Sequence, residues 1–123
     1  MDGKVAPFAP ENVFKGKTLR DGEDGWFDTG RIRVFLPTKK EVKAIYIDPK
    51  DIIISLTHFN SSARNSFEGE IEGITSNGDW VRLQVKAREL FHVLITRRSF
   101  FEMGLNIGTR VYLTFKSSAV RTF

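Results

Sequence analysis

The sequence predicts an all-β protein that contains one short helix. Short runs of alternating apolar and polar residues recur along its 123 residues, and Gly, Asn, Asp or Pro bounds most of these runs. Alternation with a period of two is typical of strands that bury one face. Residues 97–103 differ, because Thr96 stands where a helix cap is needed and Gly104 stands where a helix ends.

The expected strands follow one another with short polar turns between them. In the first half of the chain they cover residues 12–20, 26–29, 31–36, 42–47 and 52–56. In the second half they cover residues 65–75, 81–86, 90–95, 109–115 and 120–123. Asn77-Gly78 precedes the strand at 81–86, and Asn-Gly favours a tight turn, so a hairpin is expected there. Several phenylalanines are expected in the core: Phe14, Phe35, Phe67, Phe91 and Phe115.

Two pairs of similar segments indicate that the chain contains two divergent copies of one β unit. Residues 11–17 (ENVFKGK) match residues 64–70 (RNSFEGE) at an offset of 53, which is 65 minus 12. Residues 46–50 (YIDPK) match residues 113–117 (LTFKS) at an offset of 67, which is 113 minus 46. We therefore expect a first unit at residues 1–61 and a second unit at residues 62–123.

The two copies differ in charge at the matched positions. Arg64 of the second copy corresponds to Glu11, and Lys116 corresponds to Pro49. The first copy thus lacks both cations and carries a carboxylate that repels anions. Only the second copy is expected to hold a complete anion site.

Composition and spacing exclude several kinds of function. The sequence has no cysteine, which excludes disulfides and thiolate chemistry, and His58 and His92 lack the spacing of metal ligands. No G-x-x-x-x-G-K-[ST] loop occurs, so no ATPase motor is expected in this chain. Without a membrane-length apolar run or a signal pattern, we expect a cytoplasmic location. The net charge of +4 favours anions in general.

Three segments of the second unit offer hydrogen-bond donors without a neighbouring carboxylate. They are residues 62–65 (SARN), 95–99 (ITRRS) and 116–120 (KSSAV). Arg, Lys, hydroxyl groups and the free N–H groups of a helix N-terminus all donate hydrogen bonds. A set of donors of this kind suits a small dianion whose oxygens only accept.

These segments resemble the molybdate- and tungstate-binding TOBE (Mop-like) domains at the C-terminus of molybdate/tungstate ABC importer ATPases. The resemblance is specific over about residues 62–123, and residues 5–8 and 11–14 also look like the entry into this region. It implies a pair of OB-like β-barrels that acts as an oxyanion-sensing regulatory domain. Such a domain has no catalytic residues, no metal site and no cofactor, and its ligand is molybdate or tungstate.

The resemblance also implies a set of oxyanion-binding residues. Arg64 and Lys116 would supply charge, and Asn65 would supply a backbone or amide contact. Hydroxyl donors would come from Ser62, Thr96, Ser99 and Ser117. In the family such donors meet across a subunit interface, so the expected partners are a second copy of the chain and the nucleotide-binding domain of the parent ATPase. Bound oxyanion would then inhibit transport at the inner face of the membrane.

Other functions fit some of the same features. A basic OB-type barrel also suits single-stranded nucleic acid, but Trp26 and Trp80 lie in different units and are not interleaved with Lys or Arg on one strand. No nucleic-acid partner is therefore expected. A stand-alone molybdate storage protein and a module that only dimerises the ATPase remain alternatives. Arg97 and Arg98 are expected to point to solvent or to a partner subunit.

Overall fold

The structure is a computed structural model that describes residues 11–21, 24–58, 63 and 65–123. The strands of the first half are β1 (Val13–Lys15), β2 (Lys17–Asp21), β3 (Asp24–Asp28), β4 (Arg33–Phe35), β5 (Ala44–Ile47) and β6 (Ile53–Ser55). Those of the second half are β7 (Asn65–Asn77), β8 (Trp80–Ala87), β9 (Glu89–Thr96), β10 (Arg110–Phe115) and β11 (Val120–Thr122). Helix α1 spans Arg97–Met103, and two 3-10 turns, η1 (Pro49–Asp51) and η2 (Ser117–Ala119), precede β6 and β11. The predicted all-β class with one short helix is confirmed.

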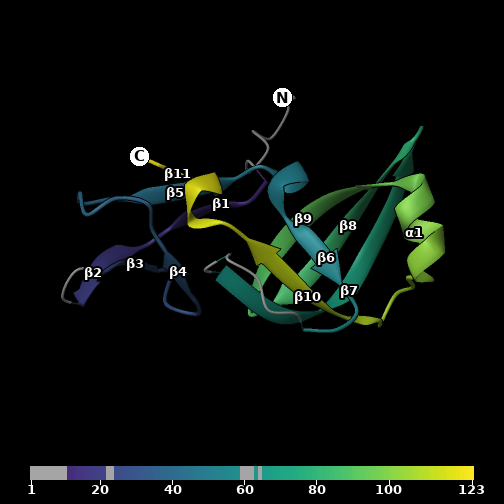
Figure 1. Cartoon of the computed structure of the whole chain (residues 1–123), viewed down its shortest axis with the longest axis horizontal. Helices are drawn as coiled ribbons and strands as arrows, with labels where there is room; N and C mark the ends of the chain where they lie inside the picture. The colour runs from purple at the N-terminus through teal and green to yellow at the C-terminus, as the bar shows by residue number, and fades with distance from the viewer. Residues whose placement is uncertain (1–10, 22–23, 59–62, 64) are drawn as a thin grey trace, which may run out of the picture.

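The strands of the described residues form three antiparallel sheets (Figure 1). The largest sheet has five strands in the order β6-β10-β7-β8-β9, and it is strongly curled, with α1 at one end. The two smaller sheets have the orders β1-β5-β11 and β2-β3-β4. Side chains of both halves join in one core cluster, in which Phe27, Phe91 and Phe115 are fully buried.

Helix α1 has the ends that the sequence predicts. The Thr96 hydroxyl accepts a hydrogen bond from the Ser99 N–H, and Gly104 adopts the left-handed conformation that ends the helix. Local residue chemistry fixes these ends. The β7–β8 turn differs slightly from expectation, because Asn77 pairs with Trp80 and the two turn residues are Gly78 and Asp79.

The expected single strand at residues 12–20 is wrong, because it is broken at Gly16. A Cβ atom at Gly16 would lie 2.1 Å from the carbonyl oxygen of Asp28. Only glycine permits this close approach of two backbones. The break places β1 and β2 in different sheets, which lets one stretch of chain serve both.

Strands β6 and β11 each pair with a strand from the other half of the chain. Ile53 of β6 pairs with Thr114 of β10, and Val120 of β11 pairs with Ile47 of β5. Val120 lies 67 residues after Ile53 (120 minus 53), and Thr114 lies 67 residues after Ile47 (114 minus 47). The offset of 67 is that of the second pair of similar segments in the sequence. The two halves therefore exchange equivalent strands. The boundary at residues 61 and 62 stays a prediction, and it runs between halves that share their sheets.

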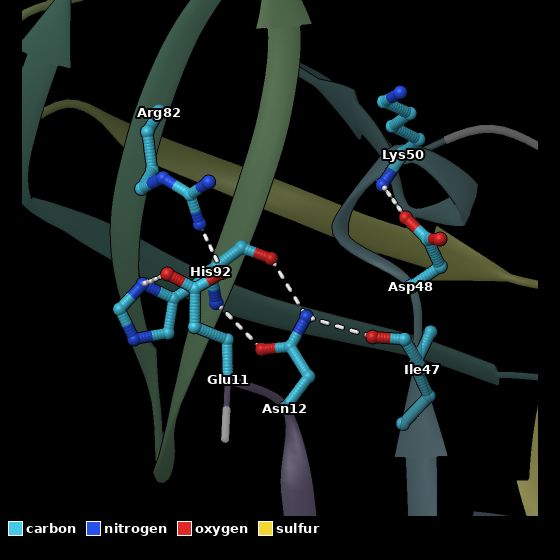
Figure 2. A network of polar contacts seen from close by, with 7 residues as sticks. All are labelled: Glu11, Asn12, Ile47, Asp48, Lys50, Arg82 and His92. Atoms are coloured by element: carbon cyan, nitrogen blue, oxygen red, sulfur yellow. Dashed lines mark hydrogen bonds and ion pairs between the residues drawn. The ribbon is translucent and has the colours of Figure 1, made fainter. Parts of the chain in front are cut away.

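Two equivalent asparagines also join the halves, each through its side-chain amide. Asn65 Oδ1 accepts from the Phe35 N–H at 2.7 Å, and Asn65 Nδ2 donates to the Phe35 carbonyl at 3.2 Å. Asn12, its counterpart in the repeat, bonds to His92 in the same way at 2.7 and 2.8 Å (Figure 2). Phe35 lies on β4 and His92 on β9, which are edge strands of their sheets. Each amide thus satisfies the free backbone groups of an edge strand in the other half.

We predict that Asn65→Ala lowers the free energy of unfolding by about 2 to 5 kcal/mol, because it removes two buried hydrogen bonds to the backbone of Phe35. Asn12→Ala should have a similar effect through His92. Urea unfolding measures both. The control is Asn106→Ala, which removes an exposed asparagine side chain and should change stability by less than about 0.5 kcal/mol. An equal effect of all three variants would contradict the role of the amides.

Candidate anion-binding site

The predicted donors that the structure describes lie in two groups at opposite ends of β7. This strand begins at Asn65, whose pairing partner in β10 is directly followed by Lys116. It ends at Asn77, which pairs with the first residue of β8, and that residue pairs with Thr96. The 13 residues of β7 extend over about 40 Å along the strand. Figure 1 likewise places α1 far from the turn between β10 and β11. The donors of one chain therefore do not converge on one site.

Lys116 and Ser117 form the first group, directly after β10. Lys116 is exposed, and its side chain makes no capping hydrogen bond to η2. No carboxylate among the described residues forms an ion pair with its ammonium group. Ser117 is half-buried beside it. The pair thus presents one cation and one hydroxyl group to an external ligand.

Three more of the predicted oxyanion-binding residues belong to the segment that leads into β7. They are Ser62, Arg64 and Asn65, and β7 begins at Asn65. The Asn65 side chain is 2% exposed, and both ends of its amide bond to Phe35. The amide of Asn65 is therefore already used within the chain, and a backbone contact to an anion stays a prediction. Ser62 and Arg64 lie outside the described residues.

Thr96 and Ser99 form the second group, at the start of α1. The Thr96 hydroxyl accepts from the Ser99 N–H at 3.1 Å and donates to Ser99 Oγ at 3.0 Å. The proton of Thr96 is thus used within the cap, which leaves the Ser99 hydroxyl free to donate to a ligand. The capping role and a binding role are compatible at this position.

Arg97 and Arg98 have different surroundings although they are neighbours. Arg97 donates through Nε to the Gly78 carbonyl at 2.9 Å and also bonds to Ser76, so its guanidinium holds the β7–β8 turn. Arg97 is nevertheless exposed, as expected, and its hydrogen bonds lie at the surface. Arg98 is exposed and pairs with Glu102 one turn along the helix, at 3.2 Å.

Glu11, the first-half counterpart of Arg64, is part of a polar network. Its carboxylate forms an ion pair with Arg82 of β8, and its Oε1 lies 3.8 Å from Nδ1 of His92 (Figure 2). The negative charge is thus partly compensated within the chain. Sequence reasoning missed Arg82 because it lies 71 residues from Glu11 and no local pattern links the two residues.

Residues 11–21, 24–58, 63 and 65–123 lack two features. They contain no group of His, Asp or Glu side chains arranged to hold a metal ion. None of their helices has the length and apolar character needed to cross a membrane.

The curled antiparallel sheet with one short helix places the chain among OB-like β proteins. The TOBE domain family matches residues 61–122, which is about half of the chain, and the chain belongs to this family. The predicted family is confirmed.

Known proteins resemble almost the whole chain. The molybdate/tungstate import ATP-binding protein WtpC of Pyrococcus abyssi is 36% identical over 115 residues, and WtpC of Pyrococcus horikoshii is 34% identical over 115 residues. These matches cover 92% of this chain but only 31% of each relative, so the chain spans about a third of their length.

A solved structure shares the fold. The cytoplasmic molybdate-binding protein ModG, in a crystal form with molybdate bound, has a TM-score of 0.73 and 20% identity. The match covers 94% of this chain and 97% of the ModG chain. This likeness confirms the expected OB-like fold.

We predict that Arg97→Ala speeds amide hydrogen exchange at the tip of the β7–β8 hairpin, because it removes the hydrogen bonds to Gly78 and Ser76. Loss of about two hydrogen bonds at an exposed site should speed exchange roughly tenfold. Arg98→Ala is the control, since it removes the same charge but only an exposed pair with Glu102. Equal protection of the tip in both variants would show that Arg97 does not hold the turn.

Proposed function

We propose that the chain binds molybdate or tungstate in the cytoplasm and serves as the oxyanion-sensing regulatory domain of an importer ATPase. The observation that carries the proposal is the similarity to two WtpC proteins over 92% of the chain, since both are named molybdate/tungstate import ATP-binding proteins. The proposed activity is binding rather than catalysis, and the ATPase would be a separate part or partner.

The two donor groups suit these anions chemically. Molybdate and tungstate are fully deprotonated near neutral pH, so each of their oxygens accepts hydrogen bonds. Lys116, Ser117 and Ser99 supply donors of this kind, and Arg64 and Ser62 are proposed to add to them. Hydrogen phosphate carries a proton that needs an acceptor and is served less well. Sulfate is smaller, and donors fixed at the ends of strands reach it less completely.

We propose that one anion bridges two copies of the chain. Lys116 and Ser117 of one copy would face Thr96 and Ser99 of the other, because β7 separates the two groups within a chain. The surface beside Thr96 supports this arrangement. Trp80 is 39% exposed and Phe101 is 67% exposed there, and both line a groove of about 600 Å³. A second copy that delivers Lys116 to this end would also cover these apolar side chains.

The proposed regulation follows from this bridge. When the anion concentration in the cytoplasm is high, the filled site holds two regulatory domains in one arrangement. If the transporter is inactive in that arrangement, the anion inhibits its own import. The size of the effect equals the difference in the anion's binding free energy between the two arrangements.

A stand-alone molybdate-binding protein is a second candidate, and one observation favours it. The structural match covers 97% of the ModG chain, so a domain of this size also occurs as a separate molybdate-binding protein. A storage role requires many anions per chain, whereas a sensor requires few. Equilibrium dialysis of the pure chain against molybdate distinguishes them by the number of anions bound per chain.

We predict that molybdate and tungstate raise the melting temperature of the chain, whereas sulfate at the same concentration has a much smaller effect. A ligand at a hundred times its dissociation constant stabilises the folded state by about 2.7 kcal/mol. Differential scanning calorimetry with the three sodium salts measures the shifts. Equal shifts with all three anions would indicate a general salt effect and would remove the specific site.

We predict that Lys116→Ala weakens molybdate binding about ten- to a hundredfold, because one charge-assisted contact contributes about 1.5 to 3 kcal/mol. The same variant should weaken molybdate-dependent self-association in parallel, as measured by sedimentation velocity. Lys86→Ala, which removes an exposed lysine on β8, is the control and should leave both unchanged. A wild-type chain that stays monomeric when saturated with molybdate would contradict the bridge.

A further inference from the structure

A second concave surface lies between the two halves of the chain. It has a volume of about 690 Å³ and is lined by residues around the end of β3, the start of β7 and the turn between β8 and β9. No predicted oxyanion donor of the described ranges lines it. Four arginines do, namely Arg31, Arg33, Arg88 and Arg110. We call this surface the arginine pocket.

The arginine pocket has more cations than its own carboxylates neutralise. Four arginines face two carboxylates, those of Asp28 and Glu68, which leaves a charge of +2 (four minus two). Arg33 lies 3.9 Å from Asp28, and Arg110 lies 3.0 Å from Glu68. The other two arginines form no ion pair with any residue that the structure describes. Two guanidinium groups are therefore available to an external anion.

The two available arginines come from different halves of the chain. Arg31 follows Gly30 in the bend between β3 and β4. Arg88 is the single residue between Ala87 and Glu89, which pair with each other. Its backbone φ angle of +68° is left-handed, a conformation that residues other than glycine and asparagine rarely adopt. A strained arginine at the rim of a pocket is a feature typical of binding sites.

We propose that the arginine pocket binds a small polyanion, a molecule with two or more phosphate or carboxylate groups. Guanidinium groups pair with both kinds of group in a planar, two-bond geometry. A molecule with two or more charged groups offers a separate partner to each of Arg31 and Arg88, whereas a single tetrahedral anion offers one group for both. The volume also lies within the range of small-molecule sites. A ligand bound there ties the first half of the chain to the second.

Isothermal titration calorimetry of the whole chain at 0.15 M salt tests the proposal. Pyrophosphate and ATP represent phosphate ligands, citrate represents carboxylates, and sulfate is the single-anion control. We expect saturable binding of at least one polyanion, at least about tenfold tighter than sulfate, which is the worth of one additional charge-assisted contact. The probe that binds best identifies the group that the pocket prefers. The absence of saturable binding by pyrophosphate, ATP and citrate overturns the proposal.

Two variants locate the binding. Arg31→Gln and Arg88→Gly should each weaken polyanion binding about tenfold or more, and glycine relieves the backbone strain at position 88, so the fold is kept. Arg20→Gln removes the same charge from an exposed position on β2 outside the pocket and should leave the affinity within about twofold. An equal loss in Arg20→Gln would show general attraction and overturn the pocket. Molybdate affinity should not change in Arg88→Gly, which separates this site from the oxyanion donors.

Discussion

Hydrogen bonds between the two halves of the chain, made by strands and by two buried asparagines, determine how the rest of the structure is arranged. One strand of each half pairs with a strand of the other half, and one asparagine amide of each half is buried against an edge strand of the other. A buried backbone group of an edge strand that has no hydrogen-bond partner lowers the stability of the folded state by about 1 to 3 kcal/mol. The two halves thus share their sheets and one core cluster.

The pairing of strands also fixes where the described candidate donors lie. Strand β7 pairs with β10 along one side and β8 along the other, so its length separates Lys116 from Thr96. The proposed bridge between two copies follows from that separation. The arginine pocket lies at the same junction between the halves. A polyanion bound there would strengthen the contact that the exchanged strands already make.

Local signals predicted the local features well. Thr96 and Gly104 define the ends of α1, and alternation placed most strands within a few residues. The repeat also matched Asn12 with Asn65, although their shared role required the folded chain. Pattern alone cannot select the partner of a strand, since β6 and β11 look alike in sequence and each pairs across the repeat. The sequence pattern likewise cannot identify the partner of a charged side chain.

The fate of individual charged residues shows this limit most clearly. Glu11 reads as an isolated carboxylate that repels anions, but Arg82 pairs with it from a distant strand. Arg97 is exposed, as its sequence context indicates, but its guanidinium also bonds to the β7–β8 turn, which the sequence did not indicate. Long side chains select partners that only the tertiary structure supplies. Lys116 and Ser99, which the sequence also identified, retain free donor groups in the folded chain, and their shared ligand remains a prediction.

Anomalous scattering of tungsten in crystals of the chain grown with tungstate locates the bound anion. We expect a peak between two copies, with Lys116 and Ser117 of one copy and Thr96 and Ser99 of the other within hydrogen-bond distance of the anion. A peak surrounded by residues of a single copy, or one located only in the arginine pocket, would contradict the bridging site.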